Sequence, residues 1–112
     1  LRAGDAVDDL PALLRDVSGP IVITTTWVMA YLAPQRRSEF ARCLADASTS
    51  RPVFWVSAEG PGVVGGLPDV EAPSVEGISA SVLGVLGYSD GRQTSAAVLA
   101  HVHPHGRWIW WY

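Results

Sequence analysis

Two short apolar runs flank a segment of helical length, and this arrangement constrains the fold more than any other feature. IVITTTWV at residues 21–28 and VFWVS at residues 53–57 are rich in the β-branched and aromatic residues that favour strands. The segment between them, PQRRSEFARCLADAS, begins with a proline, which suits the first turn of a helix. A strand, a helix and a strand in this order predict a pair of parallel strands. The sequence therefore predicts an α/β fold.

The packing faces of these elements can be read from the same spacing. The helix between the two strands is expected to bury Phe40, Cys43, Leu44 and Ala47. The first strand begins with a continuous apolar run, which is typical of a strand covered on both faces.

A further helix is expected before the first strand. Asp8 or Asp9 can cap it, and Pro11 fits its first turn. Its apolar face is expected to comprise Leu10, Leu13, Leu14 and Val17.

The last third of the chain predicts an antiparallel meander. Residues 58–77 are rich in glycine and proline and predict a long loop, which is either a lid or binding loop or, as the alternative, a flexible connector. Strands are expected at residues 78–88, 94–103 and 107–112, joined by turns at Ser89–Asp90–Gly91 and at residues 103–106.

The aromatic ending RWIWWY is apolar on both faces of its expected strand. Trp108, Trp110 and Tyr112 alternate with Ile109 and Trp111. Such a strand is expected to be covered on both sides, by this chain or by another.

Composition excludes several classes of protein. The length of 112 residues predicts a single domain, residues 1–112. The net charge of −3 offers no basic face, so we expect no nucleic-acid partner. No apolar run approaches the ~18 residues of a membrane span, so we expect a cytoplasmic protein with no membrane partner.

Several polar residues have both a structural and a functional interpretation. Cys43 is the only cysteine and lies in an apolar helical stripe, so we expect a packed thiol rather than a nucleophile. Arg36, Arg37 and Arg42 are expected on a solvated helix face, with an anion clamp as the alternative.

The alternating histidines of HVHPHG raise the question of a metal site. Zinc takes three or four ligands in near-tetrahedral geometry, and the nearest acidic residue in the sequence is Asp90. We therefore expect no metal site, with His101 and His103 on one strand face and His105 in a turn. A metal-dependent enzyme and acid–base chemistry by these histidines are the alternatives.

Four segments carry a resemblance to known proteins. GDAVDDLPALL, AYLAPQRRSEFA, FWVSAEGPGV and PHGRWIWWY together resemble the C-terminal half of a bacterial family of unknown function. That half looks like the rear portion of the class I S-adenosylmethionine-dependent methyltransferases. The resemblance implies a partial methyltransferase-like Rossmann sheet, with two parallel strands and their helices followed by an antiparallel three-strand meander. It also implies that the opening strands of the sheet lie outside this chain.

The resemblance also assigns candidate site residues. Asp5 and Ala6 match the loop that contacts the cofactor adenine. Thr26, Trp27 and Tyr31 match positions that face the substrate. Glu59 and Thr25 are the catalytic candidates, since Glu59 follows a strand at the edge where open α/β sheets bind ligands. The alternative for Glu59 is a carboxylate that is hydrogen-bonded to backbone amides.

The glycine-rich loop that holds the methionine end of the cofactor has no counterpart in this sequence. We therefore expect no cofactor in this fragment and S-adenosylmethionine only in a full-length protein. The rival interpretation is a non-catalytic binding or assembly module on a degenerate scaffold. The expected partner is the missing N-terminal half, or a second copy that pairs through an exposed sheet edge.

Overall fold

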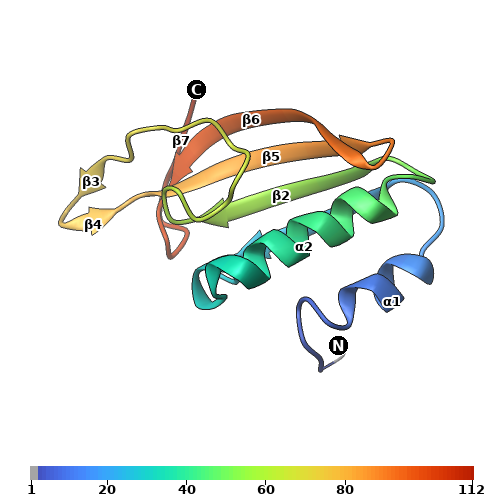
Figure 1. The fold of residues 1–112 in the computed structure, drawn as a ribbon. Helices are drawn as coiled ribbons and strands as arrows, with labels where there is room; N and C mark the ends of the chain where they lie inside the picture. Colours follow the sequence, from blue (N-terminus) through green and yellow to red (C-terminus); the bar gives the residue numbers. More distant parts are fainter. Residues whose placement is uncertain (1–2) are drawn as a thin grey trace.

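The computed structural model describes residues 3–112 and shows a mixed α/β fold with a five-stranded mixed sheet and two α-helices (Figure 1). The elements are α1 (Leu10–Arg15), β1 (Ile21–Thr26), the 3₁₀ turn η1 (Met29–Tyr31), α2 (Pro34–Ala47), β2 (Val53–Glu59), β3 (Ser74–Val75), β4 (Ile78–Ser79), β5 (Ser81–Ser89), β6 (Arg92–Val102) and β7 (Ile109–Trp111). Neither α-helix within residues 3–112 has the length and apolar character that crossing a membrane requires.

The strand order of the main sheet is β1-β2-β5-β6-β7. β1 and β2 run parallel, and every later neighbour in this sheet is antiparallel. The parallel pair and the antiparallel meander predicted from the sequence are therefore confirmed. β3 and β4 form a separate hairpin, which projects from the end of the sheet (Figure 1).

Both α-helices cover the same face of the sheet (Figure 1), and the core lies between them and β2. Trp55 of β2 is buried there and packs against Phe40 of α2, with ring centroids 5.0 Å apart. The indole Nε1 of Trp55 donates a hydrogen bond of 2.9 Å to Oγ1 of Thr25 on β1. The predicted core face of α2 is confirmed, with Phe40 and Leu44 buried and Cys43 and Ala47 packed against them.

The opposite face of the sheet is more exposed. Val22 of β1 lies beside Phe54 of β2, and their side chains are 61% and 41% exposed. The expectation that β1 is covered on both faces is therefore wrong for the described chain, because α1 and α2 lie on the same side. The aromatic ending is exposed as well, with Trp111 at 66%.

The boundaries of several elements differ from the predictions for local reasons. β1 ends at Thr26 because Trp27 takes a left-handed conformation with φ of 54°. The strand expected at residues 78–88 is divided at Ala80 between β4 and β5. β2 continues to Glu59 because it stays paired with β5.

The first helix is shorter than predicted. α1 ends at Arg15, which leaves Leu13 and Val17 exposed, whereas Leu10 and Leu14 are buried as expected. Asp9 occupies the N-cap position, but its side chain makes no capping hydrogen bond. Its carboxylate instead accepts a hydrogen bond from the backbone N–H of Asp5.

Both predicted turns of the meander are confirmed. Asp90 and Gly91 have φ of 53° and 74° between the paired residues Ser89 and Arg92, which is the two-residue turn that suits the twist of a hairpin. The later turn is closed by a hydrogen bond of 2.9 Å from Gly106 N–H to the carbonyl oxygen of His103.

The contrast between buried and exposed leucines gives a test of this core. Leu44→Ala should lower the free energy of unfolding by about 2–5 kcal/mol, because Leu44 is fully buried and truncation leaves a cavity. Leu13→Ala, at a side chain that is 40% exposed, should cost clearly less. Chemical denaturation measures both values, and equal losses would contradict the packing described above.

Candidate functional site

A groove of about 560 Å³ lies at the carboxyl end of β1, within the size range of small-molecule sites. We call it the aromatic groove; its lining residues are Thr26, Trp27, Tyr31, Ile78, Ser79, Pro104 and His105. The three residues predicted to bind substrate, Thr26, Trp27 and Tyr31, all line it. The contributions from β4 and from the β6–β7 turn could not be foreseen, because only tertiary folding brings these segments together.

Trp27 is held in an unusual conformation in this groove. Its backbone N–H still bonds the carbonyl oxygen of Ala58 at 3.1 Å, but its φ of 54° turns the chain out of the strand. This conformation costs an L-residue with a side chain about 1–2 kcal/mol. The indole Nε1 donates to Oγ of buried Ser81 at 3.1 Å, which fixes the ring. Strained residues held by their surroundings are concentrated at functional sites.

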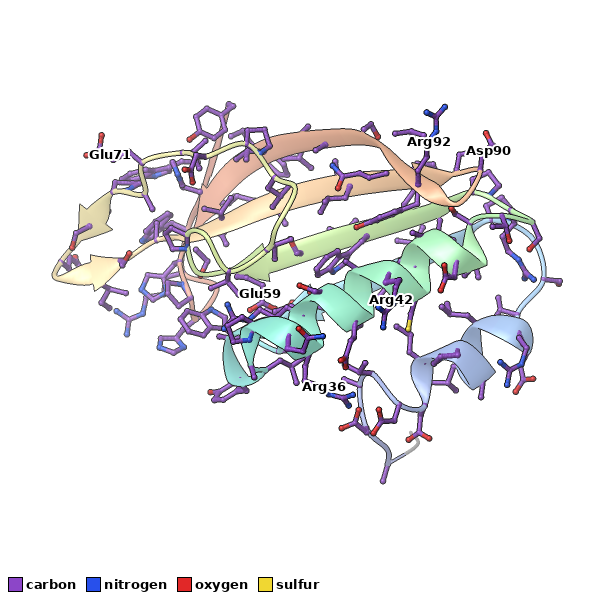
Figure 2. The ribbon with its side chains drawn as sticks, in the orientation of Figure 1. Arg36, Arg42, Glu59, Glu71, Asp90 and Arg92 are labelled. Carbon is purple, nitrogen blue, oxygen red and sulfur yellow. The ribbon has the colours of Figure 1, made fainter. Side chains whose placement is uncertain are left out.

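Glu59 lies at the end of β2 (Figure 2) and is only 1% exposed. Oε1 accepts hydrogen bonds from the N–H groups of Val28 at 2.9 Å and Met29 at 3.1 Å. Oε2 accepts a third from Ala30 at 3.4 Å. These are the backbone contacts of the alternative interpretation of Glu59, and they fix the turn η1 that carries Tyr31.

Glu59 also borders a smaller cleft of about 290 Å³ beneath the glycine-rich loop. This loop packs directly on the sheet, since a Cβ added to Gly84 would lie 2.5 Å from a methyl carbon of Leu67. The role of Glu59 as a catalytic base stays a prediction.

Thr25 lies in the core and does not line the groove. Its side chain is buried on the helix-covered face, and Oγ1 accepts the hydrogen bond from Trp55. The structure therefore separates Thr25 from its neighbour Thr26, because successive side chains of a strand point to opposite faces. A catalytic role for Thr25 also stays a prediction.

The loop that contains Asp5 and Ala6 forms a shallow hollow of about 200 Å³. Oδ1 of Asp5 accepts hydrogen bonds of 2.8 Å from the N–H groups of Asp8 and Val7. It also accepts one of 2.6 Å from the Arg36 guanidinium. The two amides, and then the arginine, lower the pKa of Asp5 below its usual 3.8, so the carboxylate is charged at neutral pH.

The arginines of α2 have three different environments. Arg36 pairs with Asp5, Asp8 and Glu39, and these contacts raise the pKa of its guanidinium (Figure 2). Arg37 donates from Nε to the carbonyl oxygens of Met29 and Leu32 at 2.9 Å. The expected solvated face is thus confirmed for Arg42, which is exposed, whereas Arg36 and Arg37 tie α2 to the preceding loops.

The three histidines have different hydrogen-bond environments. His103 is 4% exposed, and its Nδ1 accepts a hydrogen bond of 2.9 Å from His105 N–H. The proton of neutral His103 is therefore on Nε2, which is buried with no hydrogen-bond partner in the described chain. The His101 ring lies against the Tyr112 hydroxyl at 3.2 Å. Within residues 3–112, no three His, Cys, Asp or Glu side chains are grouped to hold a metal ion.

Cys43 is partly buried against the core, as expected. Burial raises the pKa of its thiol, and the nearby carboxylate of Asp46 raises it further. The thiolate is the nucleophilic form, so this environment opposes nucleophilic chemistry at neutral pH.

The fold and the aromatic groove define an α/β protein with a small-molecule-sized site at the carboxyl end of a parallel strand pair. The chain belongs to a family described as an uncharacterised protein conserved in bacteria (DUF2332), whose model matches residues 1–111. The expected membership of a bacterial family of unknown function is therefore confirmed. Comparisons with curated proteins and with solved structures found no match.

The hydrogen bonds of Glu59 give a sharp test. Glu59→Gln should lower the free energy of unfolding by about 1–3 kcal/mol, since the amide NH₂ replaces one carboxylate oxygen and cannot accept the hydrogen bond that a backbone N–H donates there. Glu71→Gln is the matched control, because Glu71 is exposed in the loop (Figure 2) and its substitution should cost less than about 0.5 kcal/mol. Chemical denaturation compares the two, and an unchanged stability of Glu59→Gln would contradict the buried hydrogen bonds.

The contacts of Asp5 predict an acid-dependent contribution to stability. Its folded pKa is below the usual 3.8, so the contribution is complete above that pH and is lost as the pH falls through the folded pKa. A ¹³C NMR titration of the carboxyl carbon should give a value below 3.8. Arg36→Ala should raise that value only in part, since both amide donors remain. Arg42→Ala, on the same helix, should leave it unchanged, and an equal shift in both variants would refute the assignment.

Proposed function

We propose that this chain forms the substrate side of a methyltransferase-like α/β domain, with the aromatic groove as the substrate site. The groove itself carries the proposal, since it unites Thr26, Trp27 and Tyr31 at the carboxyl end of a parallel strand. Open α/β sheets bind their ligands at this edge.

The Asp5 loop supplies a contact for the adenine end of S-adenosylmethionine in this proposal. Within residues 3–112, the Asp5 carboxylate accepts its hydrogen bonds at Oδ1, which leaves Oδ2 to accept one from an amino group. Arg36 fixes the loop against the first turn of α2, shortly after the turn that carries Tyr31. In this proposal one end of the cofactor lies in the hollow beside Ala6, and the cofactor when bound supplies a methyl group for transfer.

Glu59 and Thr25 remain the catalytic candidates of this proposal. As a base, Glu59 would act from a site where three backbone amides already stabilise its charged form. That observation, together with the hydrogen bond that Thr25 accepts, favours a second candidate function, a non-catalytic binding module built on the same groove.

The exposed sheet supports a proposal about partners. β1 is an outer strand of the sheet, and its residue Val22 is largely exposed. We propose that further strands pair with β1, from the preceding part of a methyltransferase-like domain or from a second copy of the chain. Pairing would remove the exposed backbone edge from water.

Calorimetry separates the two candidate functions. S-adenosylmethionine is titrated into the full-length wild-type protein and into its Asp5→Ala and Asp16→Ala variants. We expect binding that Asp5→Ala weakens by about 10- to 100-fold, the value of one hydrogen bond to a charged group. Asp16→Ala should bind normally, since Asp16 is exposed at the end of α1. A wild-type protein that releases no heat would refute the methyltransferase proposal and leave the binding module.

A further inference from the structure

The walls of the aromatic groove come from three segments, and buried polar side chains hold two of them, the end of β1 with its following turn and the β6–β7 turn. Glu59 binds the backbone of the turn that ends at Tyr31. Ser81 accepts a hydrogen bond from the Trp27 indole. His103 accepts one from the backbone N–H of His105. All three of these side chains are buried, so the backbone of these two segments and the Trp27 ring are fixed before any ligand arrives.

The lining of the groove has a distinctive chemistry. Trp27, Tyr31 and His105 contribute rings, and Pro104 and Ile78 contribute apolar surface. The polar groups are hydroxyls and an imidazole, and none of the residues lining this groove is Asp, Glu, Lys or Arg. A ligand with a full charge would therefore lose hydration without gaining an opposite charge.

The exposure of the rings indicates how a ligand is held. The Tyr31 side chain is 85% exposed and the Trp27 side chain 38% exposed, so both present surface to a ligand. Flat rings pack on one another in offset or edge-to-face arrangements, with a gain beyond the burial of area. Hydroxyl groups of Tyr31 and Ser79 can bond a polar substituent on such a ring.

We infer that the aromatic groove binds an uncharged, flat aromatic ring that carries a hydrogen-bonding substituent. This inference rests on the proposed function and names the class of its substrate. Trp27 is the rigid platform, since Ser81 and the left-handed backbone fix its ring, and Tyr31 is the adjustable wall.

A quaternary ammonium group is the rival ligand, because such cations bind against ring faces. The lining argues against it, since no carboxylate of the lining offers a countercharge to a cation. The test includes this ligand as an outcome.

NMR of the ¹⁵N-labelled protein tests the inference through the indole N–H signal of Trp27, which Trp27→Phe identifies by its loss. The probes are indole, cyclohexanol as an uncharged non-aromatic ring, indole-3-acetate as a charged aromatic ring, and tetramethylammonium. We expect indole to shift this signal to saturation and to bind roughly tenfold more tightly than each of the other three.

Two variants locate the binding. Tyr31→Ala should weaken indole binding about threefold to tenfold, and the fold should tolerate it because this side chain is exposed. Trp111→Ala removes an exposed indole outside the groove and should leave the affinity within about twofold.

Each remaining outcome overturns a defined part of the argument. A Trp27 signal that no probe shifts refutes the ring site, and tighter binding of tetramethylammonium replaces it with a cation site. Equal losses in Tyr31→Ala and Trp111→Ala refute the location. Indole binding in a protein that does not bind S-adenosylmethionine keeps the ring site and refutes the methyltransferase proposal. Binding of S-adenosylmethionine without binding of indole refutes the ring site alone.

Discussion

A buried carboxylate at the end of β2 is the constraint on which the groove depends. Glu59 is almost fully removed from water, and a charge in such a position is stable only when it is hydrogen-bonded. The N–H groups of Val28, Met29 and Ala30 supply those bonds, so the chain must bend sharply as soon as β1 ends. The left-handed conformation of Trp27 is the local consequence of that bend.

Hydrogen bonds to other buried side chains fix further parts of the groove. Most of the core is apolar, yet the buried side chains of Glu59, Ser81 and His103 each accept a hydrogen bond from a segment that borders the groove. His103 accepts its bond at Nδ1, in the β6–β7 turn, while its Nε2 has no partner in the described chain. The hydrogen bond to Nδ1 fixes the backbone of a segment that lines the groove.

The sheet itself is asymmetric. α1 and α2 cover one face (Figure 1), and the other carries exposed apolar side chains of β1 and β2. Val22 and Phe54 occupy neighbouring positions on that face. Apolar surface of this kind is typical of sheets that are completed by another segment or chain. The groove lies beyond the carboxyl end of β1, so covering that face need not close it.

Local chemistry let the sequence determine much of the architecture. β-branched runs, a proline at the first turn of α2 and the Asp90–Gly91 turn are short-range signals, and the strands, helix and hairpin they predict are present. The sequence also selected Thr26, Trp27 and Tyr31, because strand ends in α/β proteins are positions that face ligands.

Only the tertiary structure determines which segments lie beside Thr26, Trp27 and Tyr31. Ile78 and His105 reach the groove only after the long loop and the meander have folded back, and no pattern of spacing encodes that approach. Packing likewise determined that Glu59 binds amides, that Thr25 points into the core and that Val22 stays exposed, since each depends on which face the helices cover. Periodicity identifies the faces of a strand, but only the three-dimensional arrangement of its neighbours determines which face is buried.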